Sequence, residues 1–390
     1  MSRSMKAFLY CCAFLAGGIS LAGADENTGR PGNVDFNRDI QPILANYCYA
    51  CHGPDTSGRE ADLRLDLREA VMNHEGVLVP GKPDESELVR RIESKDPDER
   101  MPRNSDKQLS AEQIAMLREW VRQGAEFRDH WAFEKPVKAP LPAVQDKLWP
   151  SNEIDGFVLA RLEREGIEPN READRATLIR RVTLDLTGLL PTPEEIDAFV
   201  SDTDSNAYEK VVDRLLASER YGEHRARYWM DYARYGDTQG IHTDAYQSRW
   251  PYRDYVIRSF NDDKPYDQFT IEQLAGDLLP PENVEQLIAT GFIRCGIATG
   301  EGGTIIEELR VNLARERTEM FGSVYMGMTT GCAACHDHKY DPLSQKDHYA
   351  LTAFFNNVAE KASSDDRVDW PPNIHIPRPG NRNAYNAKLA

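Results

Sequence analysis

Two short segments of the sequence carry the same set of reactive side chains. Residues 48–52 read Cys-Tyr-Ala-Cys-His and residues 332–336 read Cys-Ala-Ala-Cys-His. This C-x-x-C-H pattern is the attachment signature of c-type haem. Its two thiols can add to the two vinyl groups on one edge of a porphyrin, while the histidine that follows binds the iron. The pattern therefore predicts two haem c groups. The predicted haem-binding residues are Cys48, Cys51, His52, Cys332, Cys335 and His336.

Paired cysteines also occur in dithiol redox sites, zinc sites and disulfides. A redox pair of the thioredoxin kind needs a βαβ context, and neither pair follows the pattern of a buried strand. Zinc needs four tetrahedral ligands, which the four cysteines of the two pairs could supply together. A simple disulfide is the remaining alternative for Cys332 and Cys335. Haem c is attached outside the cytoplasm, so export of the chain favours the haem interpretation of both pairs.

The N-terminus predicts such export. Arg3 and Lys6 precede an apolar run, and the small residues at 22–24 form a cleavage signal, so residues 1–24 are interpreted as a secretory signal peptide. Glycines interrupt the apolar run, which is short for a membrane span of about 20 residues, and no later stretch could cross a bilayer. We therefore expect a periplasmic or cell-surface protein with no transmembrane segment after cleavage.

The composition is that of a folded protein with more than one domain. The chain has 390 residues, above the roughly 100 to 200 of a typical domain, and a net charge of −17. This acidic balance disfavours nucleic-acid binding, which depends on Lys and Arg that neutralise phosphates, and it suits a redox partner protein with a basic docking surface. Two of the seven cysteines, Cys11 and Cys12, leave with the signal peptide. Cys295 is predicted to be a buried thiol.

The first motif lies in a predicted helical domain, residues 34–128. Apolar residues recur at helical spacing before Cys48, so this cysteine is expected at the end of an amphipathic helix. Ser110 and Gln113 form a capping box that opens a second helix. The apolar positions of the two helices are Phe36, Ile40, Ile43, Leu44 and Tyr47, and Ile114, Leu117, Trp120 and Val121.

Met101 is predicted to be the second axial ligand of the first iron. A thioether is a soft ligand, and Met/His ligation raises the reduction potential of haem. Met101 lies in a loop 49 residues after His52, is followed by Pro102 and precedes the capped helix, so it can fold back onto the opposite face of the iron. His74 is the alternative ligand.

This segment resembles the planctomycete cytochrome c domain, which implies a small class I-like cytochrome c fold. The chain has Arg103 where that family usually has a second proline after the Met-Pro pair, and this leaves the ligand prediction largely intact. The residues that carry the resemblance are Asp35-Phe36, Arg38 to Leu44, Cys51 to Pro54, Leu63 to Asp66, Pro80 to Pro83, Ser86 to Leu88, Met101-Pro102 and Trp120 to Ala125.

A larger helical domain is expected after a proline-rich linker at residues 129–150. Residues 151–360 contain helix caps, including Ser151 and the Thr192-Pro193 pair, and no alternating strand pattern. The fold class is therefore predicted as mainly α, with a small domain followed by a larger all-α domain. Residues 361–390 are expected to form an irregular tail.

The second domain resembles the secreted-protein domain of unknown function that follows the planctomycete cytochrome c domain. That family has no established activity, and a further C-terminal domain usually follows, so the resemblance implies that the chain is truncated. The matching residues are Leu184 to Leu189, Pro191 to Pro193, Trp250 to Ile257, Gln273 to Pro280, Gly331 to Cys335 and His336 to Pro342.

The sequence leaves the sixth ligand of the second iron open. His338 follows His336 too closely to bind the opposite face of the same iron on a helix, but it could bind another metal or a haem propionate. A five-coordinate haem is equally allowed. Three arginines before the motif could bind propionates or form a solvated helix face. The other candidate ligands are Met328, His348, His242 and His224, and the arginines are Arg310, Arg315 and Arg317.

We expect an electron-transfer protein, with two alternatives. The first is a redox enzyme in which the second haem keeps an open position for a small oxidant or substrate. The second is a polysaccharide-binding protein of the cell surface, because residues 221–260 are rich in aromatic side chains. Packing of these side chains within the helical domain, around a haem, is the competing interpretation.

Overall fold

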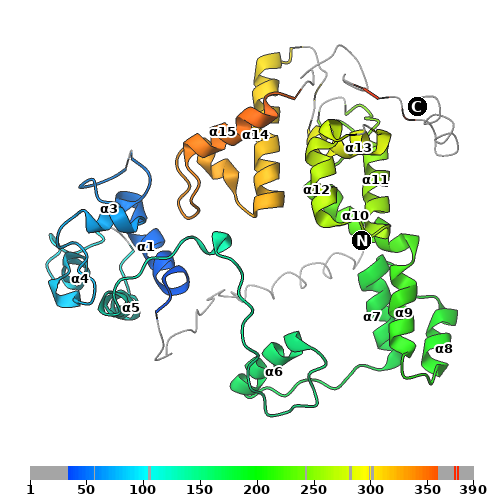
Figure 1. Cartoon of the computed structure of the whole chain (residues 1–390), viewed down its shortest axis with the longest axis horizontal. Coiled ribbons are helices and arrows are strands. Elements are labelled where there is room, and N and C mark those ends of the chain that lie inside the picture. The colour runs from blue at the N-terminus through cyan, green and yellow to red at the C-terminus, as the bar shows by residue number, and fades with distance from the viewer. Residues whose placement is uncertain are drawn as a thin grey trace, which may run out of the picture. The chain divides into compact units, whose positions relative to one another are not determined.

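The computed structural model describes residues 34–358 except 57, 104–106, 242–243, 281–282, 298 and 300–302, together with residues 373, 374 and 376 (Figure 1). The predicted signal peptide and nearly all of the predicted tail lie outside these residues. The described part of the chain is helical, with one isolated bridge between Thr238 and Tyr246 and no strand. The predicted fold class, mainly α, is therefore confirmed. No helix in this part is long and apolar enough to cross a membrane.

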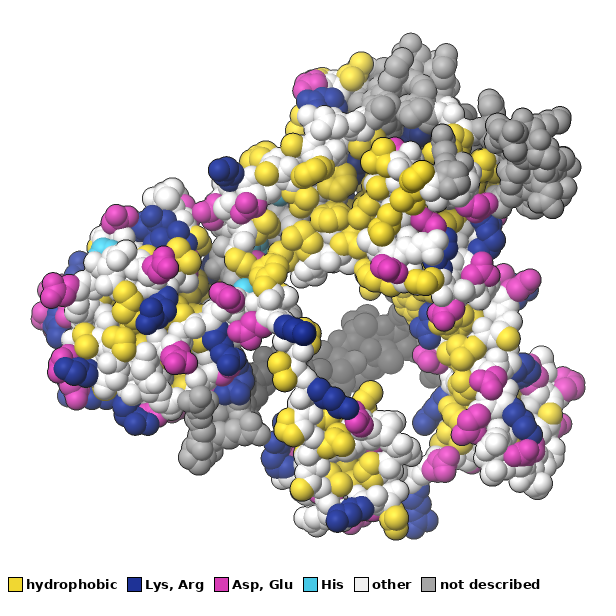
Figure 2. All heavy atoms as spheres, viewed as in Figure 1, with side chains coloured by type: hydrophobic (Ala, Val, Ile, Leu, Met, Phe, Trp, Pro, Cys, Tyr) yellow, Lys and Arg dark blue, Asp and Glu magenta, His cyan; other side chains and the backbone are white. Residues whose placement is uncertain are grey.

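The chain divides into two compact units between Glu134 and Lys135. This division falls within the stretch that the sequence predicts as a linker. On the face drawn in Figure 2, basic and acidic side chains are interspersed over both units.

The first unit is built from short helices that enclose one apolar core. Its main contacts join the first helix to α5. Phe36, Ile40 and Leu44 are almost fully buried, as are Leu117 and Trp120 of α5. The elements are η1 (Phe36–Ile40), α1 (Gln41–Tyr47), α2 (Tyr49–His52), α3 (Arg68–Met72), η2 (Pro83–Glu85), α4 (Glu87–Glu93), α5 (Ala111–Arg122) and η3 (Trp131–Phe133).

The predicted features of the first helix, which ends at Cys48, and of α5 are confirmed with one difference. The Ser110 and Gln113 capping box opens α5 as expected, and Cys48 is the residue at which α1 ends. The start of the first helix, η1, is a π-helical turn, capped by Asp35 through a hydrogen bond from the Arg38 amide.

Apart from α6, the helices of the second unit form three groups. Helices α7 to α9 form a small cluster, α10 to α13 form the largest core, and α14 and α15 pack on each other. The elements are α6 (Glu153–Glu165), α7 (Arg175–Thr187), α8 (Pro193–Ser201), α9 (Ala207–Leu216), α10 (Glu219–Tyr232), α11 (Trp250–Asn261), α12 (Tyr266–Ala275), η4 (Gly276–Leu278), α13 (Val284–Ala289), η5 (Thr290–Arg294), α14 (Ile306–Phe321), η6 (Gly322–Met326), η7 (Thr330–Ala334) and α15 (Gln345–Phe355).

The aromatic residues of segment 221–260 largely form the core of α10 to α13. Tyr252 and Tyr255 are 3% and 2% exposed, and Tyr255 stacks on Phe269 with ring centroids 6.0 Å apart. The Trp229 indole donates to Gln273 Oε1 at 2.8 Å, and the Tyr252 hydroxyl donates to the same oxygen at 2.7 Å. The buried polar atoms of these rings are thus satisfied inside the helical packing. Only some members, such as Tyr228 and Tyr232, remain exposed.

A buried ion pair lies beside this aromatic core. Glu272 of α12 is 5% exposed and accepts a hydrogen bond from the Tyr255 hydroxyl at 2.6 Å. The Lys264 ammonium pairs with the same carboxylate and lies 4.7 Å from the centre of the Tyr255 ring. Gln268 donates to the other carboxylate oxygen at 2.9 Å. Both oxygens of Glu272 are therefore bound by neighbouring side chains.

The helix caps of the second unit agree with the sequence at α8 and differ at α6. Thr192 caps α8 with a capping box to Glu195. Helix α6 is capped by Asn152, whose Oδ1 accepts the Asp155 amide hydrogen at 3.0 Å, and not by Ser151 as predicted. The Ser151 amide instead donates to the Asp155 carboxylate at 2.8 Å. Asn and Ser are about equally good caps, so the residue types alone do not decide between two adjacent positions. The cap lies one residue later than predicted.

Replacing Gly188 by alanine is expected to cost more stability than replacing Gly166. Both glycines end helices with positive φ, +70° and +67°, which costs an alanine about 1–2 kcal/mol. At Gly188 a Cβ would also lie 2.4 Å from His224 Nδ1, whereas nothing lies within 4 Å at Gly166. The clash adds about 1 kcal/mol or more. Urea unfolding of the two variants measures the difference, and equal losses would show that the His224 ring moves aside without cost.

Candidate haem sites

The first motif is wound into a single helical turn at the edge of the N-terminal core. The Cys48 amide donates to the Leu44 carbonyl at 2.7 Å, and the His52 amide donates to the Cys48 carbonyl at 2.8 Å. Cys48 packs against the core, whereas Cys51 is exposed. Burial raises the pKa of the Cys48 thiol to about 12, with a smaller contribution from Cys51. The residue after His52 is Gly53, where any larger residue would clash, because a Cβ there would lie 2.3 Å from the Tyr49 carbonyl oxygen.

A backbone contact indicates which ring nitrogen of His52 carries the hydrogen. Its Nδ1 lies 3.2 Å from the Glu60 carbonyl oxygen, and its own carbonyl accepts the Leu65 amide hydrogen at 2.8 Å. A carbonyl can only accept, so Nδ1 carries the hydrogen and Nε2 keeps its lone pair. Burial lowers the pKa of His52, and the Glu60 carbonyl opposes this effect. The neutral imidazole, which is the form that binds iron, is thus favoured, and these residues fit a covalently attached haem.

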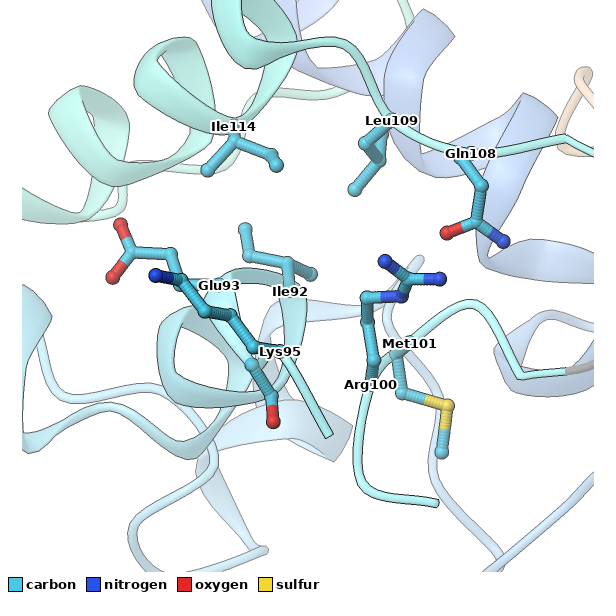
Figure 3. Close-up of a pocket in the computed structure, with 9 residues that line it drawn as sticks. Ile92, Glu93, Lys95, Arg100, Met101, Gln108, Leu109 and Ile114 are labelled. Carbon is cyan, nitrogen blue, oxygen red and sulfur yellow. The ribbon is translucent and has the colours of Figure 1, made fainter. Parts of the chain in front are cut away.

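Met101 lies at the edge of the same core and lines a pocket there. Its amide donates to the Arg91 carbonyl at 3.1 Å, and the Met101–Pro102 peptide bond is cis. Figure 3 shows its thioether directed away from Ile114 and Leu109. A pocket of about 430 Å³ is lined by Ile92, Glu93, Ser94, Lys95, Arg100, Met101, Gln108, Leu109 and Ile114.

Part of the pocket beside Met101 is lined by residues of the apolar core. Ile92, Leu109 and Ile114 line it and belong to the cluster against which Cys48 packs. The structure therefore places the pocket that Met101 lines on the same core against which Cys48 packs. His74, the alternative ligand, follows α3 and is half-buried.

The second motif begins in the short helix η7 and presents its reactive groups outward. Cys332, Cys335 and His336 are exposed, whereas Ala333 between them is fully buried. His336 Nδ1 lies 2.8 Å from the Asp337 carbonyl oxygen. As at His52, this leaves the Nε2 lone pair for a metal. Two thiols and an oriented imidazole on one accessible surface fit a second covalent haem.

Helices α14 and α15 hold the second motif in place. The Gln345 side-chain amide and the Tyr349 hydroxyl both donate to the Ala334 carbonyl, at 3.1 and 3.0 Å. The Tyr349 ring is itself exposed beside the motif. Sequence reasoning missed both residues. The only local signal was the Ser344 and Asp347 capping box that opens α15.

Two glycines allow this close packing. A Cβ at Gly331, directly before Cys332, would lie 2.9 Å from the Glu319 carboxyl carbon, and a Cβ at Gly322 would lie 2.2 Å from Thr330 Cγ2. The Thr330 hydroxyl donates to the Thr318 carbonyl of α14 at 3.2 Å. The backbone directly before the motif therefore packs closely on α14.

The candidates for the sixth ligand of the second iron have different surroundings. His348 is 1% exposed and Met328 is 5% exposed. His224 packs on Gly188 of α7, and His242 lies outside the described residues. Among the described residues, no group of three or more His, Cys, Asp and Glu side chains is arranged to hold a metal ion.

The three arginines before the motif have different surroundings. Arg310 pairs with Glu307 and contacts Asn356, whereas Arg317 is 6% exposed. Arg315 donates to Glu319 at 2.8 Å. The Glu319 hydrogen bond raises the pKa of Arg315, and Cys335 and Tyr349 act on it more weakly, so this arginine is near the motif.

Comparison with known families agrees with both resemblances. The family described as Planctomycete cytochrome C matches residues 48–104. The family described as Protein of unknown function (DUF1549) matches residues 153–360, which is more than half of the chain. No curated protein and no solved structure matches the chain.

Proposed function

Because the chain belongs to the DUF1549 family and carries a planctomycete cytochrome c domain, we propose that it is an exported electron-transfer protein with two covalent haems. The observation that carries the proposal is the shared geometry of the two motifs. In each, two cysteines precede a histidine whose Nδ1 lies within 3.2 Å of a backbone carbonyl oxygen. Two independent sites with an oriented Nε2 suit iron ligation better than a redox dithiol.

Each part of the first site has a separate task. Cys48 and Cys51 would hold the group covalently, and His52 Nε2 and the Met101 thioether would bind the metal. A bound haem supplies one-electron oxidation and reduction at iron. The apolar core beside Cys48 excludes water from one side, and such burial tunes the potential of the metal.

Location outside the cytoplasm is part of the proposal. It is supported by the composition of residues 1–24 and by the covalent attachment that the two motifs require. We place the protein in the periplasm or at the cell surface, where a redox partner protein would exchange electrons with it. The acidic net charge of −17 favours a partner with a basic contact surface.

Intact mass of the exported protein tests the proposal. We expect a chain that begins at Asp25 and carries two haems. Replacing both Cys332 and Cys335 by alanine removes one haem, and replacing both Cys48 and Cys51 removes the other. Cys295→Ala is the matched control, because this thiol is buried and donates to the Gly291 carbonyl. Retention of two haems by the variant without Cys332 and Cys335 would refute the second site.

A redox enzyme is the second candidate, and the surroundings of His336 favour it over a purely structural second domain. His336 is exposed. An open position at that iron would admit a small oxidant or substrate. Binding of carbon monoxide to the second haem of the native protein supports the enzyme, whereas two six-coordinate low-spin haems support electron transfer alone.

A further inference from the structure

The loop between the second motif and α15 is closed around the His338 ring. His338 is 8% exposed, and its Nδ1 accepts the Asp341 amide hydrogen at 2.8 Å and the Tyr340 amide hydrogen at 3.3 Å. Its own amide donates to the Leu343 carbonyl at 2.8 Å. The side chain and the backbone of one residue therefore fix both sides of the turn.

These contacts assign the tautomer of His338. Two backbone N–H groups point at Nδ1, so Nδ1 is the acceptor and the hydrogen is on Nε2. The Asp341 carboxylate lies 3.5 Å from Nδ1, too far for a hydrogen bond. With Nδ1 occupied by the turn and Nε2 protonated, His338 is neither an iron ligand nor a ligand of a second metal in this arrangement.

Asp337, the residue before His338, contacts the His336 ring through its carbonyl oxygen. The Asp337 carbonyl oxygen lies 2.8 Å from His336 Nδ1, and the Asp337 carboxylate accepts the Gln345 amide hydrogen at 2.8 Å. The first residue of α15 thus holds the Asp337 side chain, and the Asp337 carbonyl shares a peptide plane with the His338 amide, which donates to the Leu343 carbonyl. The direction of its carbonyl depends on both contacts.

We propose that His338 is a positioning residue for the second haem site: by locking the turn, it aims the Asp337 carbonyl at His336 Nδ1 and so sets the direction of the His336 imidazole. The inference rests on the proposed second haem. When a histidine binds a metal through one ring nitrogen, a hydrogen bond from the other ring nitrogen fixes the orientation of the ring and raises the basicity of the histidine. His338 would therefore act on a bound haem through His336, without touching the iron.

Two substitutions of His338 separate this role from plain structural support. Asparagine can accept the same backbone hydrogens through Oδ1, as in an Asx turn, whereas phenylalanine fills the space without an acceptor. We expect His338→Asn to keep the potential and low-spin fraction of the second haem. We expect His338→Phe to shift the potential and to raise the high-spin fraction, with two haems still attached by mass. Spectroelectrochemical titration of the full exported chain measures both quantities.

His130 provides the matched control, since its Nδ1 also accepts a backbone amide hydrogen, from Ala132 at 3.3 Å, and it belongs to the first unit. His130→Asn and His130→Phe should leave the potential of the second haem unchanged relative to each other. If His338→Asn and His338→Phe behave alike, both normal or both shifted, His338 is not a positioning residue. If the unmodified protein carries one haem by mass, the proposed second haem fails instead, and the two failures are distinguishable.

Discussion

Replacing Met101 by alanine is expected to leave the haem of the N-terminal unit five-coordinate and to lower its reduction potential on the order of 0.1 V. A thioether opposite a histidine raises the potential, and axial ligands shift haem potentials over a range of roughly 0.8 V. The open position should then bind carbon monoxide. Redox titration and absorbance spectra with carbon monoxide measure both effects.

Met116→Ala is the control for this prediction. Met116 of α5 packs against the same core, so its loss should reduce stability without changing ligation. A low-spin Met101→Ala variant that excludes carbon monoxide would contradict the assignment. His74 would then be the first residue to replace, because it is the alternative that the sequence offers.

Removing the carboxylate of Glu272 is expected to be strongly destabilising. Glu272→Ala leaves the Lys264 ammonium, whose side chain is 20% exposed, without its partner beside an apolar core. Unpairing a buried charge costs about 3–5 kcal/mol, and we expect about 3 kcal/mol because Lys264 is partly exposed. Urea unfolding measures the loss.

The exposed pair of Arg258 and Glu285 is the control for this experiment. Their N–O distance is 2.6 Å and both side chains are 41% exposed, so Glu285→Ala should cost no more than about 1 kcal/mol. The Lys264→Met, Glu272→Ala double variant should be more stable than the sum of the two single losses predicts. Equal costs for Glu272→Ala and Glu285→Ala would contradict the prediction.

The same pair predicts a dependence on pH. Burial acts to raise the pKa of Glu272, but the hydrogen bonds from Lys264, Tyr255 and Gln268 outweigh it, so the pKa lies below its ordinary value. A depressed pKa contributes stability that is complete above the unfolded-state pKa of about 4.3 and is lost as the pH falls through the folded-state pKa. Glu272→Gln should therefore lose less stability than the unmodified protein as the pH falls below about 5.

Local features of the sequence predicted most of the helical framework. The caps at Ser110 and Thr192 and the end of α1 at Cys48 depend on neighbouring residues only, so spacing is sufficient to find them. The cap of α6 shows the limit, since Asn152 and Ser151 are adjacent and equally suitable. Such choices depend on turn geometry that the residue types do not encode.

Contacts between distant residues could not be predicted in this way. The Tyr349 hydroxyl reaches the Ala334 carbonyl only because α15 packs on η7. The sequence left open why segment 221–260 is rich in aromatic residues. In the structure, Trp229 and Tyr255 of this segment pack with Phe269 and Phe292 from later helices. The direction of the Met101 thioether likewise depends on how its loop meets α4 and α5.

The two glycines beneath the second motif also bear on how fast electrons would move. Electron transfer is slowed when nuclei must rearrange between the oxidised and reduced states, a cost known as the reorganisation energy. Gly322 and Gly331 let Thr330 and the Glu319 side chain approach so closely that even a methyl group would not fit. Close-packed interiors have low compressibility. With the proposed second haem bound, the backbone that carries Cys332 would have little room to shift when the charge on the iron changes, which would keep the backbone's share of the reorganisation energy small.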